Sequence, residues 1–166
     1  MKPCRIRPVE DNDHDAVRAI FMEIVRAGET YVFPMDLPES EFPRHWLGPG
    51  MHTYVAEEHG RVVGTYMMKP NQMGLGNHVA NGSFMVPAKE RGRGVGRAMG
   101  EHALKEAKRL RFRAMQFNMV VATNTAAIRL WESLGFHIAG TLPGAFRLKD
   151  RDFQWEPGDD PIAVSY

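Results

Sequence analysis

Apolar residues recur every three or four positions in three stretches of the chain, and this spacing predicts three amphipathic helices. Their expected ranges are 12–27, 95–110 and 124–134. Residues that suit a helix N-terminus open two of them, Asn12 or Asp13 in the first and Asn124 in the last. Gly28 ends the first helix, and Gly135 lies where a left-handed C-terminal cap follows the last.

Shorter runs rich in β-branched and aromatic residues predict the strands. Their expected ranges are 6–9, 53–57, 61–68, 78–86, 114–121 and 136–141. The Glu-His-Gly turn at 58–60 predicts a hairpin. The proline-rich segment 29–50 leaves room only for a short helix over 40–47, capped by Ser40. The resulting order predicts an α/β (α+β) fold, a mixed and mostly antiparallel central sheet with helices on both faces.

Length and charge narrow the classes of function. A chain of 166 residues suits one domain over 1–166 with a single core. Its 21 basic and 20 acidic residues nearly balance, which gives no global reason to expect nucleic acid or a membrane as partner. The single cysteine, Cys4, excludes an internal disulfide and argues against a cysteine-based metal site. We expect a cytoplasmic protein without a metal.

The strand expected at 78–86 leads into a glycine-rich, basic loop that opens the helix at 95. Glycines 92, 94 and 96 allow backbone N–H groups to converge on one point. The first amides of a helix lack intrahelical acceptors and carry the positive end of its dipole. Four cationic side chains surround this loop: Lys89, Arg91, Arg93 and Arg97. Together these features predict an anion site suited to phosphate.

Spacing excludes the two common nucleotide motifs. A Walker loop requires Gly-Lys-Ser/Thr after a glycine and four residues, and no such run occurs. The dinucleotide fingerprint requires its third glycine three positions after the second, where Met99 stands, and Gly100 comes one position late. The acidic ribose partner of that fingerprint is also missing. A flexible basic loop before an ordinary surface helix stays the alternative.

Two blocks of sequence resemble the GCN5-related N-acetyltransferase (GNAT) superfamily. Arg91-x-x-Gly94-x-Gly96, after Val86-Pro87, is similar to its acetyl-CoA motif. The block 124–136 resembles its Asn-x-x-Ala-x-x-Leu-Tyr-x-x-x-Gly-Phe signature. The resemblance covers about 6–141, is closest in pattern to phosphinothricin and amino-acid N-acetyltransferases, and implies a GNAT-like acyl-CoA N-acyltransferase fold. The tail 143–166 departs from the family pattern, since only 162–166 can form a short strand.

The resemblance implies acetyl-CoA as cosubstrate and assigns residues to it. Backbone groups of the strand would pair with the pantetheine arm, and loop amides would hold the pyrophosphate. The second block would line the cofactor. The residues implied are Phe84, Met85, Val86, Arg91, Gly92, Arg93, Gly94, Val95, Gly96, Arg97, Asn124, Ala127 and Trp131. A splay between the strands at Val86 and Ala114 would admit the thioester.

The catalytic groups are less clearly indicated. Trp131 stands where many family members have a tyrosine that protonates the thiolate, so it either stacks on pantetheine or fills the core. The expected strand 78–86 carries no carboxylate, so the candidate bases lie nearby: His78, Glu57 and, from the proline-rich segment, Glu29, Tyr31 or Glu41. Asn118 could orient water or substrate. The backbone N–H of Met85 or Val86 could polarise the thioester carbonyl.

The acceptor is expected to be a small amine, such as an amino acid or a phosphinothricin-like analogue. Thr30, Tyr31 and Phe33 would form an aromatic wall with hydroxyls, or the two rings would pack under the sheet. Two other functions fit the same motifs: a non-catalytic acyl-CoA sensor, and an acetyltransferase for protein N-termini or lysines. A homodimer is compatible with the resemblance.

Overall fold

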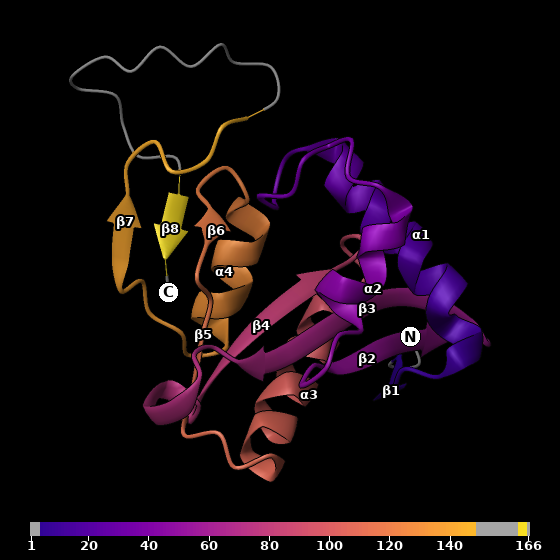
Figure 1. Ribbon diagram of the computed structural model, residues 1–166, viewed down its shortest axis with the longest axis horizontal. Coiled ribbons are helices and arrows are strands. Elements are labelled where there is room, and N and C mark those ends of the chain that lie inside the picture. Colours follow the sequence, from indigo (N-terminus) through magenta and orange to yellow (C-terminus); the bar gives the residue numbers. More distant parts are fainter. Residues whose placement is uncertain (1–3, 149–162, 166) are drawn as a thin grey trace. The chain divides into compact units, whose positions relative to one another are not determined.

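The computed structural model describes residues 4–148 and the backbone of 163–165 (Figure 1). The described residues form two compact units. The first unit contains 4–23 and 38–116, and the second contains 24–37, 117–148 and 163–165. Both lie within the single domain expected over 1–166.

The first unit is built on a five-stranded sheet in the order β1-β2-β3-β4-β5. Neighbouring strands are antiparallel except β4 and β5, which are parallel. This confirms the predicted mixed, mostly antiparallel sheet. Its elements are β1 (Arg5–Pro8), η1 (Asp11–Asp13), the first part of α1 (His14–Ala27), η2 (Glu39–Glu41), α2 (Phe42–Trp46), β2 (His52–Glu58), β3 (Arg61–Pro70), η3 (Gly74–Gly76), β4 (Val79–Met85), η4 (Ala88–Glu90), α3 (Val95–Arg109) and β5 (Ala114–Gln116).

Helices cover both faces of this sheet, as adjacent residues of β3 show. The indole N–H of Trp46 in α2 donates to the Thr65 hydroxyl at 3.0 Å. A Cβ on the next residue back, Gly64, would lie only 2.9 Å from Val95 of α3. Because successive strand residues point to opposite faces, α2 and α3 lie on opposite sides of the sheet (Figure 1).

The predicted hairpin between β2 and β3 is confirmed. Its two turn residues both have left-handed backbone, with φ of 52° at His59 and 73° at Gly60. Two consecutive positive φ angles match the right-handed twist of the flanking strands. This turn therefore fixes the register of β2 against β3, which begins with Glu58 opposite Arg61.

The start of the first helix differs from the predicted cap. The chain enters α1 through η1, and the carboxylate of Asp13 accepts a hydrogen bond from the Glu10 backbone N–H at 2.9 Å. The guanidinium of Arg7 donates to the same carboxylate at 2.6 and 2.9 Å. That contact lowers the pKa of Asp13. Asn12 is exposed within η1.

The second unit contains a three-stranded sheet in the order β6-β8-β7, with both pairs antiparallel. The central strand β8 (Ala163–Ser165) confirms the short strand expected within 162–166. Val121 and Phe146 are buried, with Met119 and Leu148 packed against them. The other elements are β6 (Val120–Val121), α4 (Thr125–Ser133) and β7 (Gly140–Leu142). The charged stretch 149–160 lies outside the described residues.

Two predicted strands were wrong in extent. The run 114–121 is not one strand, because β5 ends at Gln116 and β6 begins at Val120 in another sheet. The run 136–141 is reduced to β7, and Phe136 instead takes part in the C-terminal capping motif that follows α4. Its N–H donates to the Trp131 carbonyl at 3.1 Å, and that of Gly135 donates to Glu132 at 3.0 Å. These two bonds form a Schellman motif around Gly135, whose φ is 92°.

Candidate functional site

The C-terminal half of β4 has a strand partner on one side only, among the described residues. β4 pairs with β5 from Val79–Ala114 to Asn81–Gln116, and there the ladder ends. The antiparallel ladder with β3 continues to Met85, opposite Thr65. The predicted splay between the strands at Val86 and Ala114 was therefore misplaced. Ala114 pairs with Val79 at the start of β4, whereas Val86 follows the end of that strand. The open edge begins at Gly82.

Two hydrogen bonds show toward which neighbouring strand the backbone N–H and C=O groups of each β4 residue point. The Val79 carbonyl accepts from the Asn71 N–H on the β3 side at 2.8 Å, and the His78 carbonyl accepts from Arg113 on the β5 side at 2.8 Å. Backbone groups alternate sides along a strand, and the ladder has no register shift up to Met85. Phe84 therefore directs its N–H and C=O toward the open edge. Met85, the predicted oxyanion donor, directs its own toward β3.

The glycine loop joins this edge to the start of α3. Gly92 and Gly94 have φ of 74° and 83°, a left-handed backbone that favours glycine. Gly94 is the N-cap of α3, and its carbonyl accepts the first helical bond, from the Ala98 N–H at 3.0 Å. The N–H groups of Val95 and Gly96 consequently have no acceptor within the helix. A Cβ on Gly94 would meet no atom within 4 Å, so the space in front of the loop is open.

The four predicted cations around the loop do not share one role. Arg93 pairs with Glu90 and, at 2.7 Å, with Glu58. Arg97 lies 3.7 Å from Glu101 in an exposed pair that salt and water screen. Lys89 and Arg91 are exposed and form no ion pair with another described residue. The sequence correctly placed positive charge here, but Arg93 is already neutralised by its carboxylate partners.

The structure does not bring His78 and Glu57 to the open edge. His78 is exposed just before β4, with its ring Nδ1 3.1 Å from the Leu75 carbonyl oxygen. Six residues of strand, about 20 Å, separate it from Phe84. Glu57 lies on β2, beyond β3, and its carboxylate accepts from Arg7 at 2.7 Å. Neither position supports the predicted role as base.

The second motif block lies in the second unit. Asn124 is the N-cap of α4, and its side-chain oxygen accepts from the Ala127 N–H at 3.3 Å. Trp131 is 5% exposed, and its ring centroid lies 4.4 Å from that of Phe117 and 5.8 Å from that of Phe136. Trp131 thus packs among aromatic rings, which favours its interpretation as a core residue, and its contact with the cofactor stays a prediction.

The other predicted site residues of the second unit differ in exposure and in local structure. Asn118 lies exposed in the bend between β5 and β6 rather than on a strand. Tyr31 and Phe33 are half-buried and stacked, with ring centroids 6.0 Å apart and planes 7° from parallel. Thr30 is half-buried beside them in the sequence.

A partly buried polar cluster under α3 was not predicted from the sequence. The Tyr66 hydroxyl lies 2.7 Å from His102 Nδ1, and the Tyr54 hydroxyl donates to Glu106 at 2.8 Å. Burial raises the pKa of Tyr66 and lowers that of His102. The sequence signal was a polar pair four residues apart on α3, which falls on the helix face turned toward the sheet. The Tyr66 ring also stacks on Phe84 at 5.0 Å.

The lowered pKa of His102 predicts a pH-dependent stability. Below about pH 6.5 the unfolded chain binds a proton at this residue that the folded chain does not, so the free energy of unfolding falls as pH decreases. We expect urea unfolding at pH 7.5 and pH 5.5 to show a smaller difference for His102→Gln than for the unaltered protein. An identical pH dependence in the two proteins would contradict this prediction.

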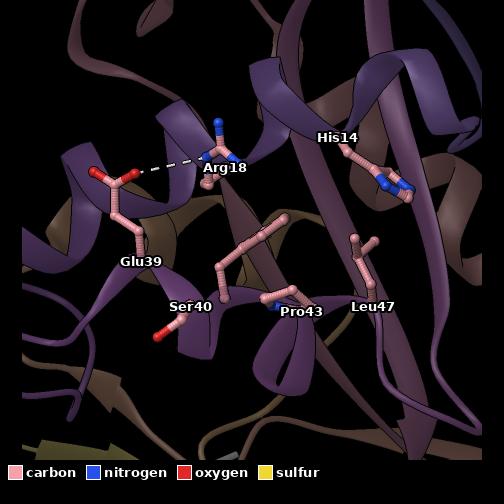
Figure 2. A pocket seen from close by; sticks show the side chains of 7 residues that line it. His14, Arg18, Glu39, Ser40, Pro43 and Leu47 are labelled. Carbon is pink, nitrogen blue, oxygen red and sulfur yellow. Dashed lines mark ion pairs between the residues drawn. The ribbon is translucent and has the colours of Figure 1, made fainter.

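A separate cavity of about 400 Å³ lies between α1 and α2 (Figure 2). Arg18 and Glu39 form an ion pair of 3.7 Å beside it, shown by the dashed line. No predicted site residue lines it, and no lining residue comes from β4, η4 or α3. Its lining residues are His14, Arg18, Glu39, Ser40, Phe42, Pro43 and Leu47.

Comparison with known proteins identifies the family of this fold. Residues 18–136 match the acetyltransferase (GNAT) family. The chain belongs to this family. A GCN5-related N-acetyltransferase from Kribbella flavida is 42% identical, with a TM-score of 0.86 over 99% of this chain and 95% of that chain. The predicted GNAT-like fold is thereby confirmed.

Two further proteins are similar to this chain over different fractions of their length. N-acetyltransferase aca1 of Schizosaccharomyces pombe (strain 972) is 41% identical over 91 residues, which cover 55% of this chain and 44% of that protein. The chain thus spans less than half the length of this curated relative. A phosphinothricin acetyltransferase from Sinorhizobium meliloti, solved in complex with AcCoA, has a TM-score of 0.81 at 20% identity, covering 99% of this chain and 88% of that chain. It shares the fold.

Residues 4–148 and 163–165 lack two features that are typical of other classes of protein. Of the helices there, none has the length and apolar character that a membrane crossing requires. The same residues contain no group of three or more histidine, cysteine, aspartate or glutamate side chains suited to hold a metal ion.

Proposed function

We propose that this chain transfers the acetyl group of acetyl-CoA to a primary amine of a small molecule. The observation that carries the proposal is the continuity, within the first unit, of the open edge of β4 with the glycine loop. Phe84 and, by continued alternation, Val86 would pair with the pantetheine amides as an added strand would. The amides from Arg91 to Arg97 would then receive the pyrophosphate.

The residues of the loop fit a diphosphate. The left-handed glycines and the first amides of α3 face open space, where a Cβ at Gly94 would meet no atom of the described residues within 4 Å. Lys89 and Arg91 supply exposed positive charge to the same loop. Charged donors and backbone N–H groups together are the usual partners of phosphate oxygens.

Acetyl transfer would proceed by direct attack of the neutral amine on the thioester carbonyl. The new C–N bond forms, the C–S bond breaks, and the nitrogen loses a proton to water or a base as the departing thiolate gains one. An N–H at the open edge would stabilise the oxyanion, and alternation favours Val86 over Met85 for this role. Holding the two reactants together lowers the barrier further.

The proposal also assigns roles to residues of the second unit. We assign Thr30, Tyr31 and Phe33 to the amine because the stacked pair offers an apolar wall beside hydroxyl groups. We also keep Asn124 and Ala127 in the proposed cofactor site because they match the family motif. A cytoplasmic setting and a homodimer belong to the same proposal.

Release of free CoA from acetyl-CoA tests the proposal directly. We expect thiol release in the presence of at least one amine from a panel of amino acids, phosphinothricin, polyamines and peptides. Isothermal titration of CoA supplies the independent measurement of binding. Absence of both binding and release would contradict the proposal.

One observation favours a second candidate, a non-catalytic acyl-CoA sensor. The residue in the position of the tyrosine acid, Trp131, is a buried indole that cannot donate a proton as a phenol does. A sensor would bind CoA in the titration and release no thiol with any amine. The same pair of measurements therefore separates the two functions.

A further inference from the structure

We propose that the side chain of Arg93 positions the glycine loop and is not itself a phosphate ligand. The proposal rests on the proposed function, since it concerns the loop assigned to the pyrophosphate. Arg93 stands between the left-handed Gly92 and Gly94, where the backbone has the greatest freedom. The sequence position of Arg93 suggests a phosphate ligand. Its side chain instead forms ion pairs that connect the loop to the β2–β3 hairpin.

This connection, called the tie below, consists of four charged residues of alternating sign: Glu58, Arg93, Glu90 and Arg61. The guanidinium of Arg93 donates to Glu90 with one nitrogen and to Glu58 at 2.7 Å with another. Arg61, at the start of β3, lies 3.3 Å from the second oxygen of Glu90. Glu58 and Arg61 face each other across the hairpin, so the loop is fastened at the same point to both β2 and β3.

Burial of Glu90 makes this arrangement more than a surface ion pair. Glu90 is 2% exposed, and the Glu58 side chain is 13% exposed. A buried carboxylate requires charged or hydrogen-bonded partners, and Arg93 supplies them to both carboxylates at once. The Glu90 N–H also donates to the Pro87 carbonyl at 2.9 Å, which fixes the backbone of η4 just before the loop.

Two consequences follow for the bound diphosphate. Because the charges of Arg93 and Arg61 balance those of Glu58 and Glu90, the cluster as a whole adds little to the potential at the loop, in contrast to the exposed Lys89 and Arg91. Because the tie holds the residue between two glycines, less conformational freedom is lost when the loop amides bind the ligand. Arg93 would therefore raise affinity by pre-organisation.

The test compares Arg93→Met with Arg91→Met, a matched exposed arginine two residues away. We expect Arg93→Met to weaken CoA binding by about tenfold. In Arg93→Met/Glu90→Gln, where the charges of Glu58 and Arg61 still cancel, the weakening should persist while the salt dependence of Kd stays unchanged. Arg91→Met should weaken binding and also reduce the salt dependence. Amide hydrogen exchange at Gly92 and Gly94 in the ligand-free protein should accelerate only in Arg93→Met, a readout that does not require CoA.

Two companion measurements keep the inference falsifiable. Acetyl-pantetheine, which lacks the diphosphate, should bind Arg93→Met as well as the unaltered protein. Should Arg93→Met fold poorly, Arg93→Met/Glu90→Gln also removes the charge of the buried carboxylate, which Arg61 alone would otherwise balance, and Arg93→Lys tests a single ammonium in place of the two-armed guanidinium. A CoA Kd within about twofold of the unaltered protein would overturn the inference, as would a loss of salt dependence in Arg93→Met/Glu90→Gln equal to that of Arg91→Met. Failure of the unaltered protein to bind CoA would instead contradict the proposed function.

Discussion

Replacing Gly94 with alanine is expected to weaken CoA binding by at least about a hundredfold. The new Cβ would enter the open space in front of the loop, and the loss of two charge-assisted N–H contacts to the diphosphate is worth roughly 3 kcal/mol or more. The substitution also places a Cβ at a φ of 83°, which costs about 1–2 kcal/mol of stability. Titration calorimetry and urea unfolding measure the two effects separately.

Gly50→Ala is the matched control for this variant. Gly50 is exposed in the turn before β2, its φ is 78°, and a Cβ there would also meet nothing within 4 Å. It should lose the same share of stability and keep full affinity for CoA. If both variants bound CoA as well as the unaltered protein, the loop would not be the diphosphate site.

Elements defined by local patterns were predictable from the sequence. The turn at His59 and Gly60 carries its own conformational signal, and so do the Asn124 cap and Gly135 at the two ends of α4. In each case neighbouring residues decide the backbone through sterics or a short-range hydrogen bond. The left-handed glycines of the loop belong to the same class, which is why the candidate anion site could be located.

Features that depend on distant partners could not be predicted. The alternation of Met115, Phe117, Met119 and Val121 indicates an extended chain, but it does not say that β5 and β6 pair in different sheets. The partner of β6 is β8, more than 40 residues later in the chain. Pairing across such separations is decided by tertiary packing rather than by local periodicity.

Charge pairing in the candidate site shows the same limit. Four cations near the loop suggested four phosphate ligands, whereas Glu58, 35 residues before Arg93 in the chain, accepts a hydrogen bond from its guanidinium. The direction of the Met85 N–H likewise follows from the register of β4 against β3, which the sequence does not reveal. A cluster of charged residues or the end of a predicted strand therefore indicates where a site lies. It does not show which role each residue has within that site.

Replacing Trp131 with alanine is expected to lower the free energy of unfolding by about 3–5 kcal/mol. The indole is 5% exposed between Phe117 and Phe136, so truncation leaves a cavity among aromatic rings. Glu132→Ala, an exposed change on the same helix, should stay within about 0.5 kcal/mol in the same urea titration. Equal stability of the two variants would contradict the core role.

Trp131→Tyr then separates packing from chemistry at this position. If the side chain only fills the core of the second unit, a phenol there should not raise kcat for thiol release, and stability should fall because the smaller ring leaves part of the space empty. A rise in kcat would show instead that this position faces the departing thiolate and that the family tyrosine can be restored. In that case the buried indole would be limiting the rate of acetyl transfer, and the pH profile of the variant should acquire the ionisation of the new phenol.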